Sequence, residues 1–98
     1  MSKESKAGEY VLVIDLGTGG PKAGLINQEG HVAACTSAPV QLFFLPDGGA
    51  ENDPAEWWSS IKGSVKKVLQ ESGVSPKDIV AVGVTSYWGV TVPVDEKG

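Results

Sequence analysis

The order of apolar and polar residues divides the chain into short extended runs and one helical stretch. Residues 10–14 form a continuous β-prone run, which is typical of a strand buried on both faces. Two further runs, residues 22–26 and 31–36, flank a four-residue turn that ends in glycine, which indicates a β-hairpin. The chain is therefore predicted to open with three strands joined by turns.

A helix is predicted to begin directly after Asp53. This aspartate can cap the helix, Pro54 suits the first helical position, and Glu56 completes a capping-box pattern. Gly73 can adopt the left-handed conformation that ends many helices. One apolar stripe runs between these two signals, as expected for a helix that covers a core. Its members are Trp58, Ile61, Val65, Val68 and Leu69.

The rest of the chain is predicted to add two strands and connections. Residues 39–52, with two prolines and two adjacent glycines, resemble a long connection. After a helical turn at residues 75–78, residues 79–85 are predicted as a second buried strand, parallel to the first through a right-handed crossover. Residues 90–94 would be a fifth strand, and Pro93 indicates a sheet edge.

Composition and charge exclude several classes of partner. The 98 residues carry a formal net charge of −4, and all eight cations are lysines. Because guanidinium groups are lacking, nucleic acid is not an expected partner. No apolar run approaches the roughly 18 residues that span a bilayer, so membrane contact is not expected. The single cysteine, Cys35, fits the reducing cytoplasm and is interpreted as a small buried residue. The polar residues 1–9 are expected to be flexible, and residues 10–98 to fold.

A glycine-rich turn, residues 17–20, follows the first strand and is the main candidate for ligand binding. Closely spaced N–H groups in such a turn can surround anionic oxygens. A Walker-type loop would need Ser or Thr after Lys22, where this chain has Ala23. A dinucleotide fingerprint would need glycine at position 22 and then a helix. A plain hairpin with a glycine-rich bend remains the alternative.

The pattern that is left resembles the first phosphate loop of the actin-like ATPase superfamily: an acid at a strand end, Gly-Thr in the turn, and a second antiparallel strand. The resemblance implies ATP and Mg²⁺ as cofactors, with Asp15 orienting water around the metal and Lys22 offsetting phosphoryl charge. Asp15 and Lys22 are thus the catalytic candidates. The candidates for contact with ATP are Gly17, Thr18, Gly19 and Gly20.

Two further segments resemble the FGGY family of carbohydrate kinases. Residues 51–58 are similar to the "E-x-D-P-x-x-W" start of that family's first long helix, and residues 82–95 to its next strand and substrate loop. The resemblance implies an α/β fold with a mixed sheet of the ribonuclease H-like, actin-like ATPase type. It also implies transfer of the γ-phosphoryl group of ATP to a hydroxyl of a small sugar (ketose) or polyol.

The resemblance implies a sugar-binding role for Ser86, Tyr87 and Trp88. This run matches neither the Gln-Met-His type of xylulose kinases nor the Gln-Arg-Glu type of glycerol kinases, so neither substrate is carried over. The family's catalytic base and adenine pocket lie further along the chain. We therefore expect an N-terminal piece that is inactive alone and that associates as a homodimer through its uncovered sheet. A non-catalytic actin-like chaperone or filament protein, and a complete small binding module, are the alternatives.

Overall fold

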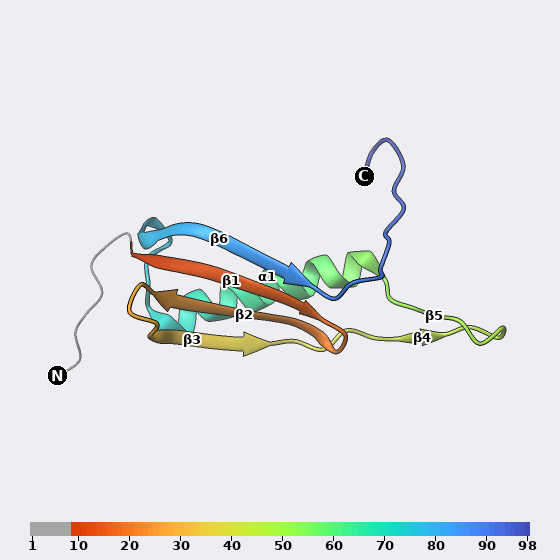
Figure 1. Cartoon of the computed structure of the whole chain (residues 1–98), viewed down its shortest axis with the longest axis horizontal. Coiled ribbons are helices and arrows are strands. Elements are labelled where there is room, and N and C mark those ends of the chain that lie inside the picture. The colour runs from red at the N-terminus through yellow and green to blue at the C-terminus, as the bar shows by residue number, and fades with distance from the viewer. Residues whose placement is uncertain (1–8) are drawn as a thin grey trace.

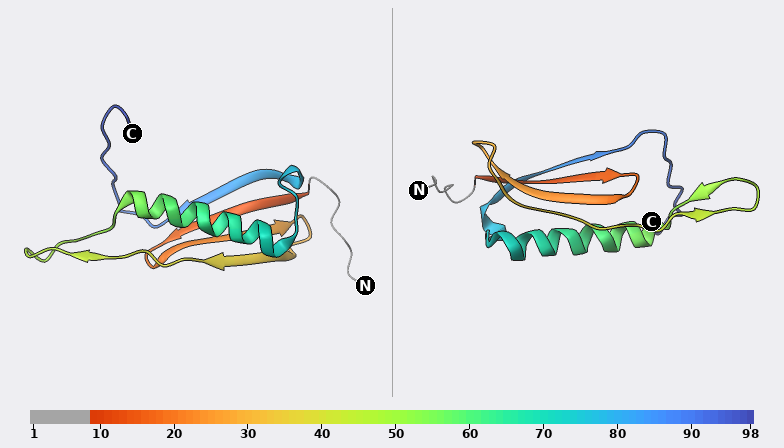
Figure 2. Two further views of the ribbon diagram at one scale, coloured as in Figure 1. Left: turned by 180° about the vertical axis from the view of Figure 1, so that it is seen from behind. Right: turned by 90° about the horizontal axis from the view of Figure 1, so that it is seen from below.

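Four strands form a mixed sheet that carries one long helix on one face (Figure 1, Figure 2). The computed structural model of the protein describes residues 9–98. The central strand β1 (Tyr10–Gly17) pairs antiparallel with β2 (Gly20–Asn27) and parallel with β6 (Ile79–Ser86). β3 (Val32–Ser37) pairs antiparallel with β2, so the order across the sheet is β3-β2-β1-β6. The predicted meander and the predicted parallel strand are both confirmed. The flexible segment predicted at residues 1–9 lies, apart from residue 9, outside the described residues.

The turn between β2 and β3 is closed by a side chain. The Oδ1 atom of Asn27 accepts hydrogen bonds from the backbone N–H groups of Glu29, at 3.0 Å, and of His31, at 2.8 Å. Asparagine favours turns because its short side chain can bond the backbone a few residues on. The side chain is buried, so the turn is anchored at the end of the core.

Helix α1 (Pro54–Ser72) begins and ends at the residues that its sequence signals indicate. The carboxylate of Asp53 accepts the N–H of Ala55 at 2.9 Å. Gly73 has φ 70° and donates its N–H to the carbonyl of Leu69, which closes the last turn. The capping box was wrong in one respect. The Oε1 atom of Glu56 accepts the backbone N–H of Gln41 at 3.0 Å, so its carboxylate ties the helix to the segment before β4.

The core lies between α1 and the strands β1, β2 and β3. Its buried apolar residues are Leu12, Ala23, Leu25 and Val68. One hydrogen bond crosses this layer, from the hydroxyl of Thr36 to the carbonyl of Ser64, at 3.2 Å. The helix then leads through a short 3₁₀ helix, η1 (Pro76–Asp78), into β6, which returns parallel to β1 as the right-handed crossover rule expects.

The prediction that residues 79–85 are buried was wrong. β6 forms as expected, but Val80, Val82 and Val84 are 63%, 59% and 62% exposed. In the parallel register, Val82 and Val84 stand beside Leu12 and Ile14, so they point to the same face as α1. They stay exposed because the helix covers β2 and β3 and does not reach the outer strand (Figure 2).

Two other predictions were wrong, and one was incomplete. Residues 90–94 form no strand. The connection at residues 39–52 contains a small hairpin, β4 (Phe43–Phe44) with β5 (Ala50–Glu51), which extends beyond the end of the sheet (Figure 2). Cys35 is exposed, because its neighbours in β3 face the helix and it points to the uncovered face. Within the apolar stripe of α1, Trp58 is 59% exposed and lies beside Lys62, whose Nζ is 5.6 Å from the ring centre.

The tightest backbone approach in the turn from β1 to β2 is at Gly20. Its φ is 129°, and a Cβ atom there would lie 1.9 Å from the carbonyl oxygen of Ala38. Side chains rarely adopt this φ, and the neighbouring backbone cannot move aside without breaking the bond from the N–H of Ala38 to the carbonyl of Pro21.

We therefore expect Gly20→Ala to lower the free energy of unfolding by about 2 kcal/mol or more, through backbone strain and the clash together. Gly19→Ala is the matched control, since nothing lies within 4 Å of a Cβ at Gly19. Urea unfolding followed by tryptophan fluorescence measures both variants. Equal midpoints for the two variants would contradict the role given to Gly20.

Candidate functional site

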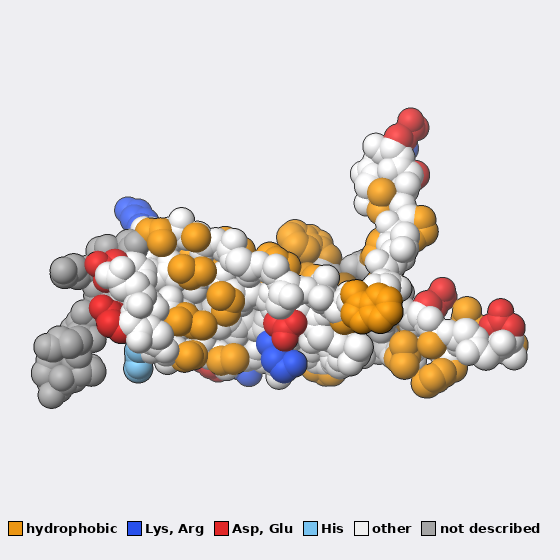
Figure 3. Space-filling view, viewed as in Figure 1, with side chains coloured by type: hydrophobic (Ala, Val, Ile, Leu, Met, Phe, Trp, Pro, Cys, Tyr) orange, Lys and Arg blue, Asp and Glu red, His pale blue; other side chains and the backbone are white. Residues whose placement is uncertain are grey.

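Three polar side chains form one row across the sheet, near the carboxyl end of β1. Asp15 is paired in register with Lys22 on β2 and with Thr85 on β6. Cross-strand partners point to the same face, and Asp15 is an odd number of positions from Leu12, whose side chain lies in the core under α1. The row therefore lies on the face away from the helix, and all three side chains are exposed. Figure 3 shows acidic and basic side chains together on this face.

The turn that continues β1 brings backbone and an ammonium group together. A Cβ atom at Gly17 would lie 3.6 Å from Nζ of Lys22, so this ammonium group reaches the start of the turn. Thr18 and Gly19 form the tip of the turn and are exposed. Pro21 supplies no N–H group, and Gly17 and Gly20 are partners in the strand pairing, so the N–H groups at the tip of the turn are those of Thr18 and Gly19.

A groove of about 1000 Å³ lies between the end of the sheet and the start of α1. Leu16 and Thr18 line it from β1 and its turn, Trp57 from the helix, and Ser86 and Tyr87 from the end of β6. Such a position, beyond the carboxyl ends of parallel strands, is where ligands bind in open α/β sheets. The groove thus brings Thr18 of the glycine turn into the same cavity as Ser86 and Tyr87.

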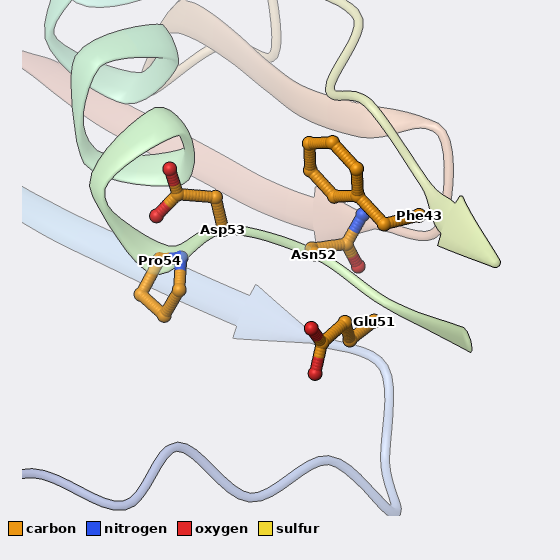
Figure 4. A pocket seen from close by; sticks show the side chains of 5 residues that line it. All are labelled: Phe43, Glu51, Asn52, Asp53 and Pro54. Atoms are coloured by element: carbon orange, nitrogen blue, oxygen red, sulfur yellow. The ribbon is translucent and has the colours of Figure 1, made fainter. Parts of the chain in front are cut away.

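A smaller cavity of about 430 Å³ borders this groove at the start of α1. Figure 4 shows Asn52 beside Phe43, and Asp53 turned towards the first turn of the helix. Glu51 and Asn52 line both cavities, so the segment that leads into the helix forms the wall between them.

Tyr87 is anchored in the groove by three contacts. Its N–H donates to the carbonyl of Leu16 at 3.2 Å, which continues the parallel pairing one residue beyond β6. Its ring is tilted by 39° against the ring of Trp57, with 6.4 Å between the ring centres, within the range of favourable aromatic pairs. Its hydroxyl donates to Oδ1 of Asn52 at 3.5 Å.

The predicted site residues lie at one end of the molecule, but of them only Thr18, Ser86 and Tyr87 line the groove. Asp15 and Lys22 point to the face away from α1, outside the groove. The turn 17–20 and the pair Asp15 and Lys22 lie at the end of β1, beside Ser86 and Tyr87 at the end of β6. Trp88 is 93% exposed and is not among the residues that line the groove. The contact of Trp88 with a sugar stays a prediction.

Asn52 and Trp57 belong to the groove and were missed from the sequence. Both were interpreted only as parts of the helix start. One signal was available, because Trp57 lies outside the apolar stripe of α1 and so needs another surface to cover it. Nothing in the sequence indicated the contact between Asn52 and Tyr87, which are 35 positions apart.

The carboxylate of Asp15 fits a magnesium ion that is coordinated mainly by water and phosphate oxygens. Within residues 9–98, no three His, Cys, Asp or Glu side chains gather into a metal-binding cluster. Asp15 offers its carboxylate beside the glycine turn. Mg²⁺ in nucleotide sites keeps several waters and uses one or two carboxylates together with phosphate oxygens. A Mg²⁺ ion bound with ATP and reached through water is compatible with this arrangement.

Comparison with known proteins identifies the family of this chain. The model of the "FGGY family of carbohydrate kinases, N-terminal domain" matches residues 10–98. The chain belongs to the FGGY family of carbohydrate kinases. This family assignment favours the kinase over the chaperone, the filament protein and the complete binding module that the sequence left open.

The similar FGGY proteins include a glycerol kinase, a xylulose kinase and a gluconate kinase. The glycerol kinase of Alkaliphilus oremlandii is 32% identical over 88 residues, which are 90% of this chain and 18% of that protein. The crystal structure of xylulose kinase from Rhodospirillum rubrum has a TM-score of 0.81 and 27% identity, and covers 91% of this chain and 18% of that chain. Gluconate kinase from Lactobacillus acidophilus has a TM-score of 0.69 and 26% identity, and covers 79% of this chain and 15% of that chain.

These FGGY structures confirm the predicted fold class, a mixed sheet of the ribonuclease H-like, actin-like ATPase type. The chain spans less than a fifth of the length of the relatives that it matches. Most of each relative therefore has no counterpart in these 98 residues.

Proposed function

We propose that the whole protein transfers the γ-phosphoryl group of ATP to a hydroxyl of a small sugar, such as a ketose, or of a polyol. The observation that carries the proposal is the groove, because Thr18 of the glycine turn and Ser86 and Tyr87 of the β6 end line the same cavity. A phosphoryl donor on one side and an alcohol on the other would meet there. A kinase accelerates this reaction by positioning the two and by stabilising charge.

On the donor side, the proposed contacts are backbone N–H groups of Gly17, Gly19 and Gly20 and the hydroxyl of Thr18. Lys22 would offset negative charge on the transferred group, since its ammonium lies beside the turn. Asp15 would orient water ligands of Mg²⁺. ATP supplies the phosphoryl group, and Mg²⁺ neutralises part of its charge.

On the acceptor side, Ser86 and Tyr87 would bond hydroxyls, and Trp88 would cover the apolar face of a sugar. Residues 9–98 contain no further carboxylate that we assign as the catalytic base. We propose that the base and the adenine pocket are supplied by parts of the enzyme that have no counterpart in this chain. The 98 residues alone would then be inactive.

The reducing cytoplasm is the proposed location, because the single cysteine forms no disulfide and ATP is abundant there. Among the described residues, no helix is both long and apolar enough to cross a membrane. The proposal as a whole is tested by ATP turnover of the full-length protein across a panel of ketoses, aldoses and polyols. Failure to phosphorylate any of them would overturn it.

Replacement of Asp15 tests the donor side. We expect Asp15→Ala in the full-length enzyme to lower kcat by at least about 100-fold, because the carboxylate organises Mg²⁺ in the transition state. The fold should survive, since the side chain is exposed. Circular dichroism checks the fold, and unchanged turnover at saturating Mg²⁺ would exclude this role.

Replacement of Trp88 tests the acceptor side. Every acceptor meets the same triphosphate, so discrimination between sugars must come from residues beyond the glycine turn. We expect Trp88→Ala to change the ratio of kcat/KM between competing sugars more than it changes the KM for ATP. An altered KM for ATP with the same ranking of sugars would contradict a sugar contact.

A homodimer is the proposed assembly of the chain, because β6 is an outer strand with three exposed valines and no charged residue. We expect the 98-residue protein to sediment as a monomer–dimer mixture that shifts with concentration. Val82→Lys on β6 should shift it to monomer, whereas Lys77→Ala, outside the strand, should not. A monomer at every concentration would refute the proposed dimer.

A further inference from the structure

Asn52 is held in one orientation by bonds to a neighbouring segment. Its Nδ2 atom donates to the carbonyl of Gln41 at 2.8 Å, and the N–H of Gln41 donates to the carboxylate of Glu56 at 3.0 Å. The amide nitrogen is thereby used, and the amide oxygen is the atom that faces Tyr87. Asn52 therefore meets Tyr87 as an acceptor.

This arrangement decides the hydrogen-bonding character of Tyr87. A phenol has one hydrogen to donate, and Asn52 accepts it. The lone pairs of the same oxygen remain available to accept, and Tyr87 lines the groove. The bond is long, at 3.5 Å, but hydrogen bonds of active sites often tighten when the substrate binds.

The ring of Tyr87 is fixed as well. Trp57 packs against it from the helix, and its backbone N–H is bonded to Leu16 of β1. The position of the hydroxyl is thus set by three elements: β1, α1 and the segment that leads into α1. A phenol held in this way recognises one hydroxyl of a bound molecule at little further entropic cost.

We propose that Asn52 is a positioning residue that makes Tyr87 a hydrogen-bond acceptor for one hydroxyl of the phosphate acceptor. The inference rests on the proposed kinase function and adds to it the chemistry of the substrate. A molecule bound there must offer a donor at this position, as a sugar or polyol hydroxyl does. A carboxylate, an ether or a ketone oxygen at the same position can only accept, so it would face an oxygen with no hydrogen to give.

The charge on the groove wall also favours a neutral acceptor. Glu51 of β5 lines the groove next to Asn52. An anionic sugar with its carboxylate on this side would meet a like charge as well as an acceptor oxygen. The geometry points to a neutral, polyhydroxylated acceptor.

The test is a double-mutant cycle in the full-length enzyme, with the best acceptor of the panel and its monodeoxy analogues. In the wild type, removal of one particular hydroxyl should lower kcat/KM at least about tenfold. Tyr87→Phe and Asn52→Ala should each lower kcat/KM for the complete acceptor by about the same factor and abolish the preference over that one analogue. The double variant should resemble either single variant, because both remove the same bond.

Two further variants separate positioning from folding. Asn52→Asp keeps an acceptor oxygen for the phenol but removes the Nδ2 donor to the carbonyl of Gln41, so it should retain more of the preference for the complete acceptor than Asn52→Ala does. Tyr10→Phe is the matched control, since Tyr10 is a partly buried tyrosine that packs against the core at the start of β1. It should leave every ratio unchanged, and the KM for ATP should stay within about twofold in all variants.

The outcomes distinguish the two proposals. A wild type that phosphorylates no sugar or polyol overturns the proposed function and this inference with it. Two results with an active wild type would overturn only the inference. One is a double variant whose loss in kcat/KM is the product of the losses from Asn52→Ala and Tyr87→Phe. The other is a loss in kcat/KM that is equal for every analogue.

Discussion

The parallel pairing of β1 with β6 is the constraint on which the site depends. Two strands that are far apart in sequence end at the same edge of the sheet because the helix between them returns the chain parallel to β1. The register then aligns Asp15 with Thr85 and Leu16 with Ser86. Without this pairing, the glycine turn would be a hairpin bend with nothing opposite it.

The regular elements could be predicted because their signals are local. Asp53, Pro54 and Gly73 fixed the ends of α1, and the β-prone runs fixed β1, β2 and β3 within a few residues. The tight turn between β1 and β2 could be predicted as well, from its glycines between two β-prone runs, whereas its phosphate binding stays a prediction. In each case the residues that determine the element lie within it or directly beside it.

Burial and side-chain partners could not be predicted, because they depend on which strand lies where. Val82 and Val84 read as core residues, and only the sheet order shows that α1 does not reach them. Glu56 reads as half of a capping box, yet a backbone N–H from a distant segment takes its carboxylate. Asn52 carries no local signal of its contact with Tyr87, which exists only once β6 has paired.

The distance in sequence between paired strands also affects the order in which they pair during folding. The meander of β1, β2 and β3 closes through short turns, whereas β6 can join only after a long loop has been closed by the whole of α1. The groove is therefore expected to form last during folding. By the same reasoning it opens first, so amide hydrogens at Tyr87 should exchange with solvent sooner than those of β2. The part of the molecule that we propose recognises the acceptor is thus also the part that opens most readily.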